Sequence, residues 1–210
     1  MKTPESYLIP SRSAKRAHFD SETIYPILDE ALLCTVSCVL DGRPFSIPTA
    51  FVRFEDKIYL HGSVGSHFIR EIEKGIPVCI VVTLMDALVV AKSAFSHSMN
   101  YRSVVLFANA EKVEGYDEKI EAFKWLTNKM VPGSWDYLRP VTESEVRKTA
   151  VLAFRLEEAS AKIRKGMPND EPEDKALSIW SGIIPFEVHQ MTPIADETSG
   201  EIDLPPHLGN

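Results

Sequence analysis

The run PVCIVVTLMD (77–86) is the feature that most restricts how this chain can fold. Almost every residue in it is apolar, without the regular alternation of a strand that faces water on one side. Such a run is typical of a strand that is buried on both faces. It is much shorter than the roughly 20 apolar residues that cross a bilayer. We therefore expect this strand to lie inside a closed sheet, and no segment to span a membrane.

Strand-like segments precede this run. LLCTVSCVL (32–40) and RPFSIPTAFVRF (43–54) are joined by Asp41-Gly42, a pair typical of a tight hairpin. KIYLHG (57–62) follows after a short polar turn. These three segments predict an antiparallel meander.

Further strands are expected behind the run, together with short helices. ALVVAKSAF (87–95) is close enough to be the hairpin partner of the run, and residues 101–115 and 151–165 each predict one long strand. Local patterns predict helices over residues 20–31, 63–75, 117–130 and 142–150. Six or seven strands with mainly hairpin connections indicate a mainly β protein, a small barrel whose openings are plugged by helices.

The chain of 210 residues is long enough for one domain with a substantial core. We expect this domain to cover residues 16–186, with an arm before it (1–15) and a loosely ordered tail after it (187–210). The acidic, proline-containing segment 166–176 carries no hydrophobic pattern and is expected to be a surface loop.

Composition excludes several classes of function. The net charge of −7 argues against non-specific binding of nucleic acid, which needs a basic face. The first residues resemble no secretory signal, so we expect a soluble, cytoplasmic protein. Cys34 and Cys38 fall on one face of a predicted strand, and they and Cys79 are expected to be buried free thiols in a reducing compartment.

Metal and nucleophile chemistry receive little support from the sequence. His61, His67 and His97 invite a metal site, but no carboxylate cluster accompanies them, and no metal is predicted. A pair of His97 with a neighbouring serine lacks the strained G-x-S-x-G turn of a nucleophilic serine.

The stretch LHGSVGSHFIRE has a pattern that suits a phosphate. Gly62, Ser63 and Ser66 lie between a strand and a helix that carries Arg70. Backbone N–H groups, hydroxyls and an arginine at such a place bind anions. Glycine and serine are common there for turn formation alone, so these residues by themselves do not establish a phosphate site.

Three other stretches are ambiguous. Pro48, in IPTAF, removes a hydrogen-bond donor from a strand, so it belongs at an edge or at a bulge, with or without a ligand beside it. Trp180 fits a core position or an aromatic wall for a planar ligand. HSMNYRSVVLF (97–107) places polar residues against an apolar strand, as in a loop-to-strand junction or in the wall of a binding site.

Taken in order, these pieces resemble the pyridoxamine 5′-phosphate oxidase-like superfamily of FMN-binding split barrels. They are most similar to its flavin-nucleotide-binding branch, which is related to nitroimidazole-resistance proteins. The resemblance covers about residues 16–186. Besides the first helix, it rests on DGRPFSIPTAF, DKIYLHGSVGSHFIREI, GIPVCIVVTLMDALVVAKSAF, HSMNYRSVVLFANAEKV and WSGIIP.

The resemblance implies an antiparallel split β-barrel and a homodimer with FMN at the subunit interface. By position, the residues that it places beside the flavin ring are Pro48, Thr49, Ala50, His61, Gly62 and Ser63. Ser66 and His67 fall at the phosphate, and Arg102 and Ser103 fall on a later strand whose polar side chains reach the flavin. Trp180 corresponds to a tryptophan that comes from the other subunit.

Three departures from the family pattern limit what can be carried over. The strand FSIPTAF lacks the two basic residues that the family places near the flavin. The family's Ser-Arg-Lys phosphate clamp is Ser66-His67-Phe68 here, so Arg70 or Lys92 would have to supply positive charge. The C-terminal R-L-H-x-R signature of pyridoxamine-phosphate oxidases is absent.

The resemblance therefore favours an FMN-dependent oxidoreductase that passes electrons from a nicotinamide donor, NADH or NADPH, to a small acceptor. His61 is the candidate for an acid or base near the flavin, and a purely structural histidine is the alternative. Two further hypotheses are a flavin- or heme-binding module without turnover and, with less support, pyridoxamine-phosphate oxidation itself.

Overall fold

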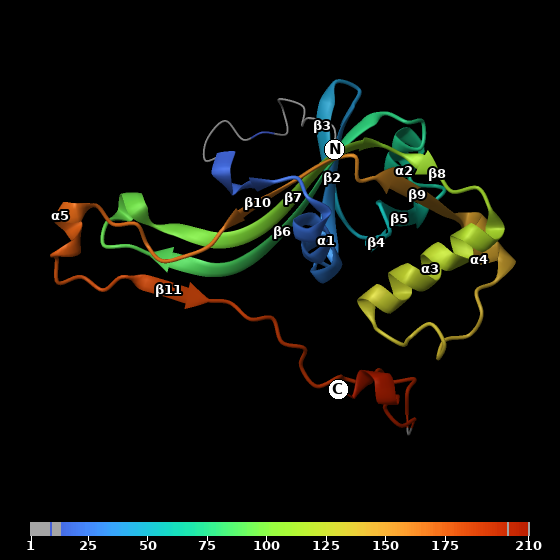
Figure 1. Ribbon diagram of the computed structural model, residues 1–210. Helices are drawn as coiled ribbons and strands as arrows, with labels where there is room; N and C mark the ends of the chain where they lie inside the picture. The colour runs from blue at the N-terminus through green and yellow to red at the C-terminus, as the bar shows by residue number, and fades with distance from the viewer. Residues whose placement is uncertain (1–8, 10–13, 201, 210) are drawn as a thin grey trace.

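Two antiparallel β-sheets form the body of the protein, and short helices lie around them (Figure 1). The computed structural model describes Ile9, residues 14–200 and residues 202–209. The predicted N-terminal arm (1–15) therefore lies almost entirely outside the described residues. Within them the fold is mainly β with short helices, as expected for a split barrel, and every strand pair is antiparallel.

The larger sheet has seven strands, and the smaller sheet has four. The larger sheet follows the order β1, β10, β7, β6, β2 and β3, with β11 paired to β6: β1 (Ala17–His18), β2 (Leu33–Leu40), β3 (Arg43–Ala50), β6 (Pro77–Val90), β7 (Ser98–Asn109), β10 (Glu158–Arg164) and β11 (Gly182–Pro185). The smaller sheet follows the order β4 (Val52–Phe54), β5 (Lys57–Ser63), β9 (Thr149–Arg155) and β8 (Glu111–Lys112).

The first four α-helices form where the sequence predicts them, and α5 does not. The helices are α1 (Ser21–Glu30), α2 (His67–Ile72), α3 (Tyr116–Met130), α4 (Glu143–Lys148) and α5 (Pro172–Lys175). Asp20 caps α1, because its carboxylate accepts a hydrogen bond of 2.8 Å from the backbone N–H of Thr23. α5 is a short helix inside the segment that we expected to be a plain loop.

The predicted meander of three strands is wrong. β2 and β3 form the expected hairpin at Asp41 and Gly42, which both have positive φ. The segment 43–54 is not one strand, however, because β3 ends at Ala50 and β4 starts at Val52 in the other sheet. Phe51 and Val52 are adjacent and both buried, which a straight strand with alternating faces does not allow.

The predicted partner of the apolar run is also wrong. β6 continues through residues 87–90 as one strand of 14 residues, and it pairs with β7. The register shifts between Met85 and Ala87, so Asp86 lies in a bulge. The chain reverses only at the bend and 3₁₀ turn over residues 92–96.

Burial of β6 on both faces is not found in the single chain. Val78, Ile80 and Val82 are almost fully buried, whereas Cys79 and Val81 on the opposite face are only half-buried. The sequence pattern thus predicts that both faces of β6 are buried, whereas a single chain leaves the face with Cys79 and Val81 partly exposed.

Two expected strands are each divided between the sheets. Residues 151–165 form β9 and β10, which are separated by a turn at Leu156 and Glu157. The strand expected over 101–115 ends at Asn109, after which β8 joins the smaller sheet. With the crossing at Phe51, these passages from sheet to sheet produce more strands than the six or seven expected.

The main core lies between the two sheets and under α1. Phe51, Leu60 and Phe154 are among its fully buried side chains. Cys34 and Cys38 both point into it from β2 as free thiols, and burial raises the pKa of the Cys34 thiol to about 12. A second, smaller core forms where α3 packs on the smaller sheet. It contains Val52, Tyr59, Val113, Ala122, Leu126, Val151 and Ala153.

An extended arm projects from the body (Figure 1). It consists of the far ends of β6 and β7, with α5 near its tip and β11 along β6. The tail then returns toward the loop between α3 and α4, where the ring of His207 lies 5.3 Å from that of Tyr137. Among the described helices, none is long and apolar enough to cross a membrane.

Replacing Phe154 by alanine should destabilise the protein strongly. Its side chain is 0% exposed and packs between the sheets, so truncation leaves a cavity that costs about 3–5 kcal/mol. Equilibrium unfolding in urea measures the loss. Tyr116→Ala, at the exposed start of α3, is the control and should change the free energy of unfolding by about 0.5 kcal/mol or less. Equal losses in the two variants would contradict this assignment of the core.

Candidate functional site

A small hollow lies between the edge strand β3, the end of β5 and α2. We call it the β3–β5 hollow, and its volume is about 170 Å³. It is lined by Ile47, Thr49, Leu60, His61, Gly62, Ser63, Ser66, Phe68 and Ile69. Five of the residues predicted for the cofactor site, Thr49, His61, Gly62, Ser63 and Ser66, therefore meet in one place. Pro48 and Ala50 flank Thr49 on β3, and the predicted edge position of Pro48 is confirmed.

The serine hydroxyls of the hollow hold the turn between β5 and α2. Ser63 Oγ accepts a hydrogen bond of 3.1 Å from Gly65 N–H. Ser66 Oγ caps α2 by accepting from Ile69 N–H at 3.4 Å, and Ser66 N–H donates to the Ser63 carbonyl at 2.9 Å. Because each hydroxyl acts as an acceptor here, its own proton remains available to a ligand.

Gly62 is required by close packing. A Cβ atom at this position would lie 2.7 Å from both Cδ1 and Cγ1 of Ile69. The absence of a side chain lets α2 approach β5, and this approach forms the floor of the hollow.

Positive charge near the hollow comes from Arg70. Its side chain is exposed, and it forms no hydrogen bond or ion pair within the described part of the chain. His67 is also exposed, and its Nδ1 lies 3.8 Å from a Glu71 carboxylate oxygen. Of the two cationic candidates on α2, Arg70 is therefore the one without an ion-pair partner among the described residues.

Lys92 and Trp180 do not line the hollow of their own chain: Lys92 follows β6 and Trp180 precedes β11, two strands of the arm (Figure 1). Lys92 Nζ donates to the carbonyls of Lys175 and Leu177, and its backbone N–H donates to Asp170 at 2.7 Å. Trp180 is 65% exposed, and its ring lies so close to Gly182 that a Cβ there would be 2.9 Å away. Within one chain, these two residues and the hollow are not brought together.

Arg102 is already occupied by two carboxylates. Its guanidinium donates to Asp86 at 2.7 Å and to Glu30 at 2.8 Å, which raises its pKa and lowers that of Glu30. Ser103 Oγ donates to the carbonyl of Lys162 at 3.2 Å. The polar residues of HSMNYRSVVLF thus lie in strand β7. Arg102 also lines a separate opening of about 350 Å³, between β6, β7 and β11.

His61 borders a second, larger cavity that the sequence did not predict. This cavity, about 320 Å³ in volume, lies between β5, α3, α4 and the loop that joins the two helices, and we call it the α3–α4 cavity. Its lining is His61, Phe123, Leu126, Thr127, Met130, Trp135, Leu138, Arg139, Val141, Glu145 and Thr149. The surrounding chain partly desolvates the His61 ring, which lowers its pKa, although the residue keeps some exposed surface.

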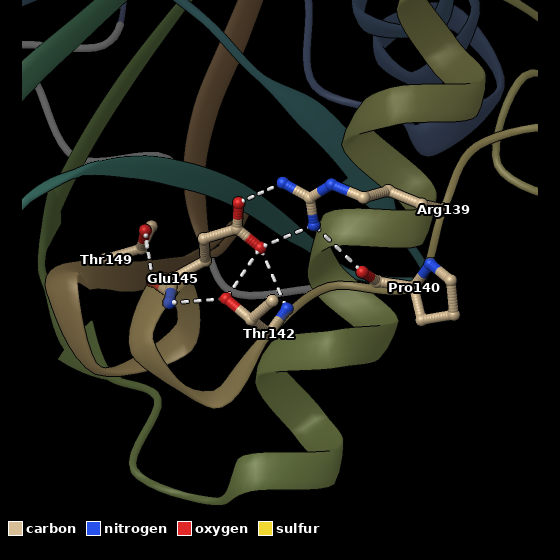
Figure 2. Close-up of polar contacts among 5 residues, drawn as sticks. All are labelled: Arg139, Pro140, Thr142, Glu145 and Thr149. Atoms are coloured by element: carbon tan, nitrogen blue, oxygen red, sulfur yellow. Dashed lines mark hydrogen bonds and ion pairs between the residues drawn. The ribbon is translucent and has the colours of Figure 1, made fainter.

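An ion pair and a helix cap form the polar side of this cavity (Figure 2). The carboxylate of Glu145 accepts from the guanidinium of Arg139, from Thr142 N–H at 2.8 Å and from Thr142 Oγ at 2.9 Å. Thr142 Oγ accepts from Glu145 N–H in return, so a complete capping box starts α4. Chiefly because of Arg139, the pKa of Glu145 falls to about 2.

The family follows from comparison with known proteins. No curated protein matches the chain. The sequence pattern of the family described as pyridoxamine 5′-phosphate oxidase matches residues 20–163. The chain belongs to this family. Membership confirms the split-barrel relationship predicted from the sequence, and it leaves the activity open.

Solved structures include two similar proteins that span almost the same length. The flavocytochrome Anf3 from Azotobacter vinelandii is 35% identical, with 98% of this chain and 96% of that chain covered and a TM-score of 0.92. The FAD- and heme-binding protein from Mycobacterium smegmatis is 34% identical, with 91% and 95% covered and a TM-score of 0.87. A protein assigned to 5-nitroimidazole antibiotic resistance from Bacteroides thetaiotaomicron shares the fold at 23% identity, with 70% and 86% covered and a TM-score of 0.60.

A methyl group at residue 62 should disturb the hollow. Gly62→Ala forces Ile69 and α2 outward, which we expect to cost about 1–3 kcal/mol of stability. Urea unfolding measures this loss, and hydrogen exchange in α2 should become faster. Gly65→Ala is the matched control, because the nearest atom to its Cβ, Ser63 Oγ, is 3.4 Å away. Equal stability of the two variants would contradict the close approach.

Because of the capping box of α4, the stability of the protein should depend on pH in the acidic range. A carboxyl whose pKa is lowered on folding stabilises the protein above its unfolded pKa, and this contribution is lost as the pH falls toward the folded value of about 2. Glu145→Gln should therefore be less stable than the wild type at pH 7, and the difference should shrink below about pH 4. Thermal unfolding over this range measures it. Glu143→Gln removes a carboxylate of α4 that takes no part in the box, and a difference as large in that control would contradict the assignment.

Proposed function

We propose that this protein is a redox protein of the flavocytochrome type, which binds a flavin in the β3–β5 hollow and heme as a second redox group. One observation carries the proposal. Two relatives that are at least 34% identical over at least 91% of this chain are a flavocytochrome and an FAD- and heme-binding protein. Both redox groups match hypotheses that the sequence raised, namely flavin-dependent electron transfer and heme binding.

The hollow offers groups that suit the polar part of a flavin nucleotide. Ser63 and Ser66 have hydroxyl protons to donate, and Arg70 has a free guanidinium. Thr49 lies on an edge strand, where one side of the backbone is unpaired and can contact a ligand. The bound flavin supplies the electron-transfer chemistry, and these residues would anchor and orient it.

We propose FAD as this flavin, in place of the FMN expected from the sequence. A terminal phosphate such as that of FMN carries a charge of about −1.5 to −2 at neutral pH. In the pyrophosphate of FAD the charge is spread over two phosphate groups, and each group carries one negative charge. The total charge of the two nucleotides is therefore similar, and the support for FAD is the relative of 34% identity that binds FAD and heme.

A second copy of the chain is the partner that the exposed apolar surface supports. Phe95 is 95% exposed, and the outer face of β6 keeps half-buried apolar residues. Other large apolar side chains on the arm and tail are exposed as well: Met85, Leu88, Met99, Leu177, Ile179, Trp180, Ile184, Phe186, Val188, Met191 and Ile194. Such an extended apolar surface marks an interface. In a homodimer, the arm could bring Lys92 and Trp180 to the hollow of the other subunit.

NADH or NADPH as electron donor and a small molecule as acceptor complete the proposal. The alternative is a flavin- and heme-binding module without turnover, for storage or sensing. Pyridoxamine-phosphate oxidation is less well supported, because the sequence lacks the family's C-terminal R-L-H-x-R signature.

The native protein should release FAD. We expect an absorption spectrum of an oxidised flavin, and mass spectrometry of the released ligand should give the mass of FAD. Anaerobic NADH or NADPH should bleach the flavin bands, and an added acceptor should restore them over many cycles. A protein without flavin that also fails to bind added FAD would overturn the proposal. Reduction without repeated turnover would favour the module.

Variants of α2 test the hollow as the flavin site. Arg70→Gln should weaken retention of the flavin by roughly ten- to hundredfold, because a hydrogen bond to a charged group contributes about 1.5–3 kcal/mol. The control Lys74→Gln removes a charge that is already paired with Glu71 and should leave retention unchanged. Equal retention in both variants would place the phosphates elsewhere.

A further inference from the structure

We propose that the α3–α4 cavity is the heme site, with His61 as an axial ligand of the iron. This inference rests on the proposed function, since it assigns a place to the second redox group. A porphyrin needs an apolar slot, an axial side chain that can bind iron, and a polar rim for its propionates. The cavity provides all three from different parts of the chain.

The apolar walls come from α3 and from the loop that follows it. Phe123, Leu126 and Met130 line the cavity from α3, and Trp135 and Leu138 line it from the loop. The volume of about 320 Å³ lies at the lower end of the range of about 300–1,000 Å³ for ligand pockets. Residues 131–142 form no helix or strand, so this outer wall can adjust to a flat ligand more easily than α3 can.

His61 is the histidine positioned to bind iron in this cavity. Its ring lines the wall, and neither ring nitrogen has a hydrogen-bond partner within the described part of the chain. An imidazole without a partner beside an apolar cavity is free to coordinate a metal. His97 and His189, in contrast, are bonded to Ser93 and Glu187. His207 packs against Tyr137 of the loop and does not line the cavity.

The two other soft ligands near this region are less well placed. Cys34 is buried in the core between the sheets, away from the cavity lining. Met130 lines the cavity, but it lies at the end of α3 with half of its surface exposed. A thioether is also a weaker ligand than an imidazole, so Met130 serves as the competing hypothesis in the test.

Arg139 supplies the cation at the polar rim. Its guanidinium bonds to Glu145 and to the carbonyl of Pro140 at 3.0 Å, and its Nε–H takes part in none of these bonds (Figure 2). A guanidinium has five N–H donors, so it can donate a hydrogen bond to a further carboxylate. A heme propionate at this rim would share the Arg139 guanidinium with Glu145, whose carboxylate also lines the cavity and opposes a second negative charge.

His61 also lines the β3–β5 hollow, so one side chain borders both sites. The proposed iron ligand therefore directly precedes Gly62 and Ser63, which line the flavin hollow. The end of β5 would separate the two redox groups by little more than the thickness of a strand. This arrangement suits electron transfer between them.

Heme titration of the purified, flavin-loaded protein tests the assignment. Binding is followed by the Soret band, by heme content and by electron paramagnetic resonance of the ferric iron. His61→Ala should weaken heme binding at least about tenfold, since the loss of groups that merely support a metal ligand costs about 10–100-fold. Added imidazole should restore the Soret band of this variant, which a purely structural role of His61 would not permit. His189→Gln, at an exposed histidine outside both linings, should behave as the wild type.

Several outcomes would overturn the inference. An unchanged spectrum and affinity in His61→Ala would remove His61 as the ligand, and so would a loss of heme that imidazole does not restore. If Met130→Leu lost the wild-type heme spectrum while His61→Ala kept it, the axial ligand would be Met130 and not His61. A wild-type protein that retains FAD but binds no heme would overturn the heme site and leave the flavin proposal standing. A protein that binds neither would overturn both.

Discussion

The packing of the two sheets against each other, centred on Phe51 and Phe154, is the interaction on which the rest of the structure depends. Both side chains are almost fully buried between the sheets. Phe51 is also the point at which the chain leaves the larger sheet for the smaller one. Because this crossing takes a single residue, the end of β3 stays beside β5, and the β3–β5 hollow opens between them. The core thus positions the candidate site.

Local sequence was sufficient to predict one half of the candidate site. The residues 61–66 are contiguous, and their glycines and serines have a recognisable chemical pattern, so they were identified together with Thr49 by family position. The strand crossings were harder to predict. At Phe51 the apolar character continues from β3 into β4 without a glycine or proline, and at Leu156 charged neighbours mark a turn but no glycine or proline does. Only the second sheet, which is a tertiary feature, divides the segment.

The α3–α4 cavity could not be predicted in the same way, because its lining comes from β5, α3 and the loop over residues 131–142. Each apolar residue in it looks like an ordinary core residue when the sequence is read alone. One signal was present in α3. Its apolar stripe includes Phe123 and Met130, yet of the stripe only Leu126 is almost fully buried. A stripe wider than the core needs is a sign that the helix faces something besides the core.

The distribution of positive charge argues for Arg70, and against Arg102, as the partner of a nucleotide phosphate. Arg102 links α1 and β7 with the bulge of β6 through Glu30 and Asp86. A phosphate there would have to displace two carboxylates or lie close to them, and both repel it. Arg70 forms no ion pair or hydrogen bond with a carboxylate within the described residues, although Glu71 beside it attracts its charge, and it lies on α2, the helix that borders the hollow. The family resemblance led to Arg102 by strand position, whereas the charges around each guanidinium decide which one is free to bind an anion.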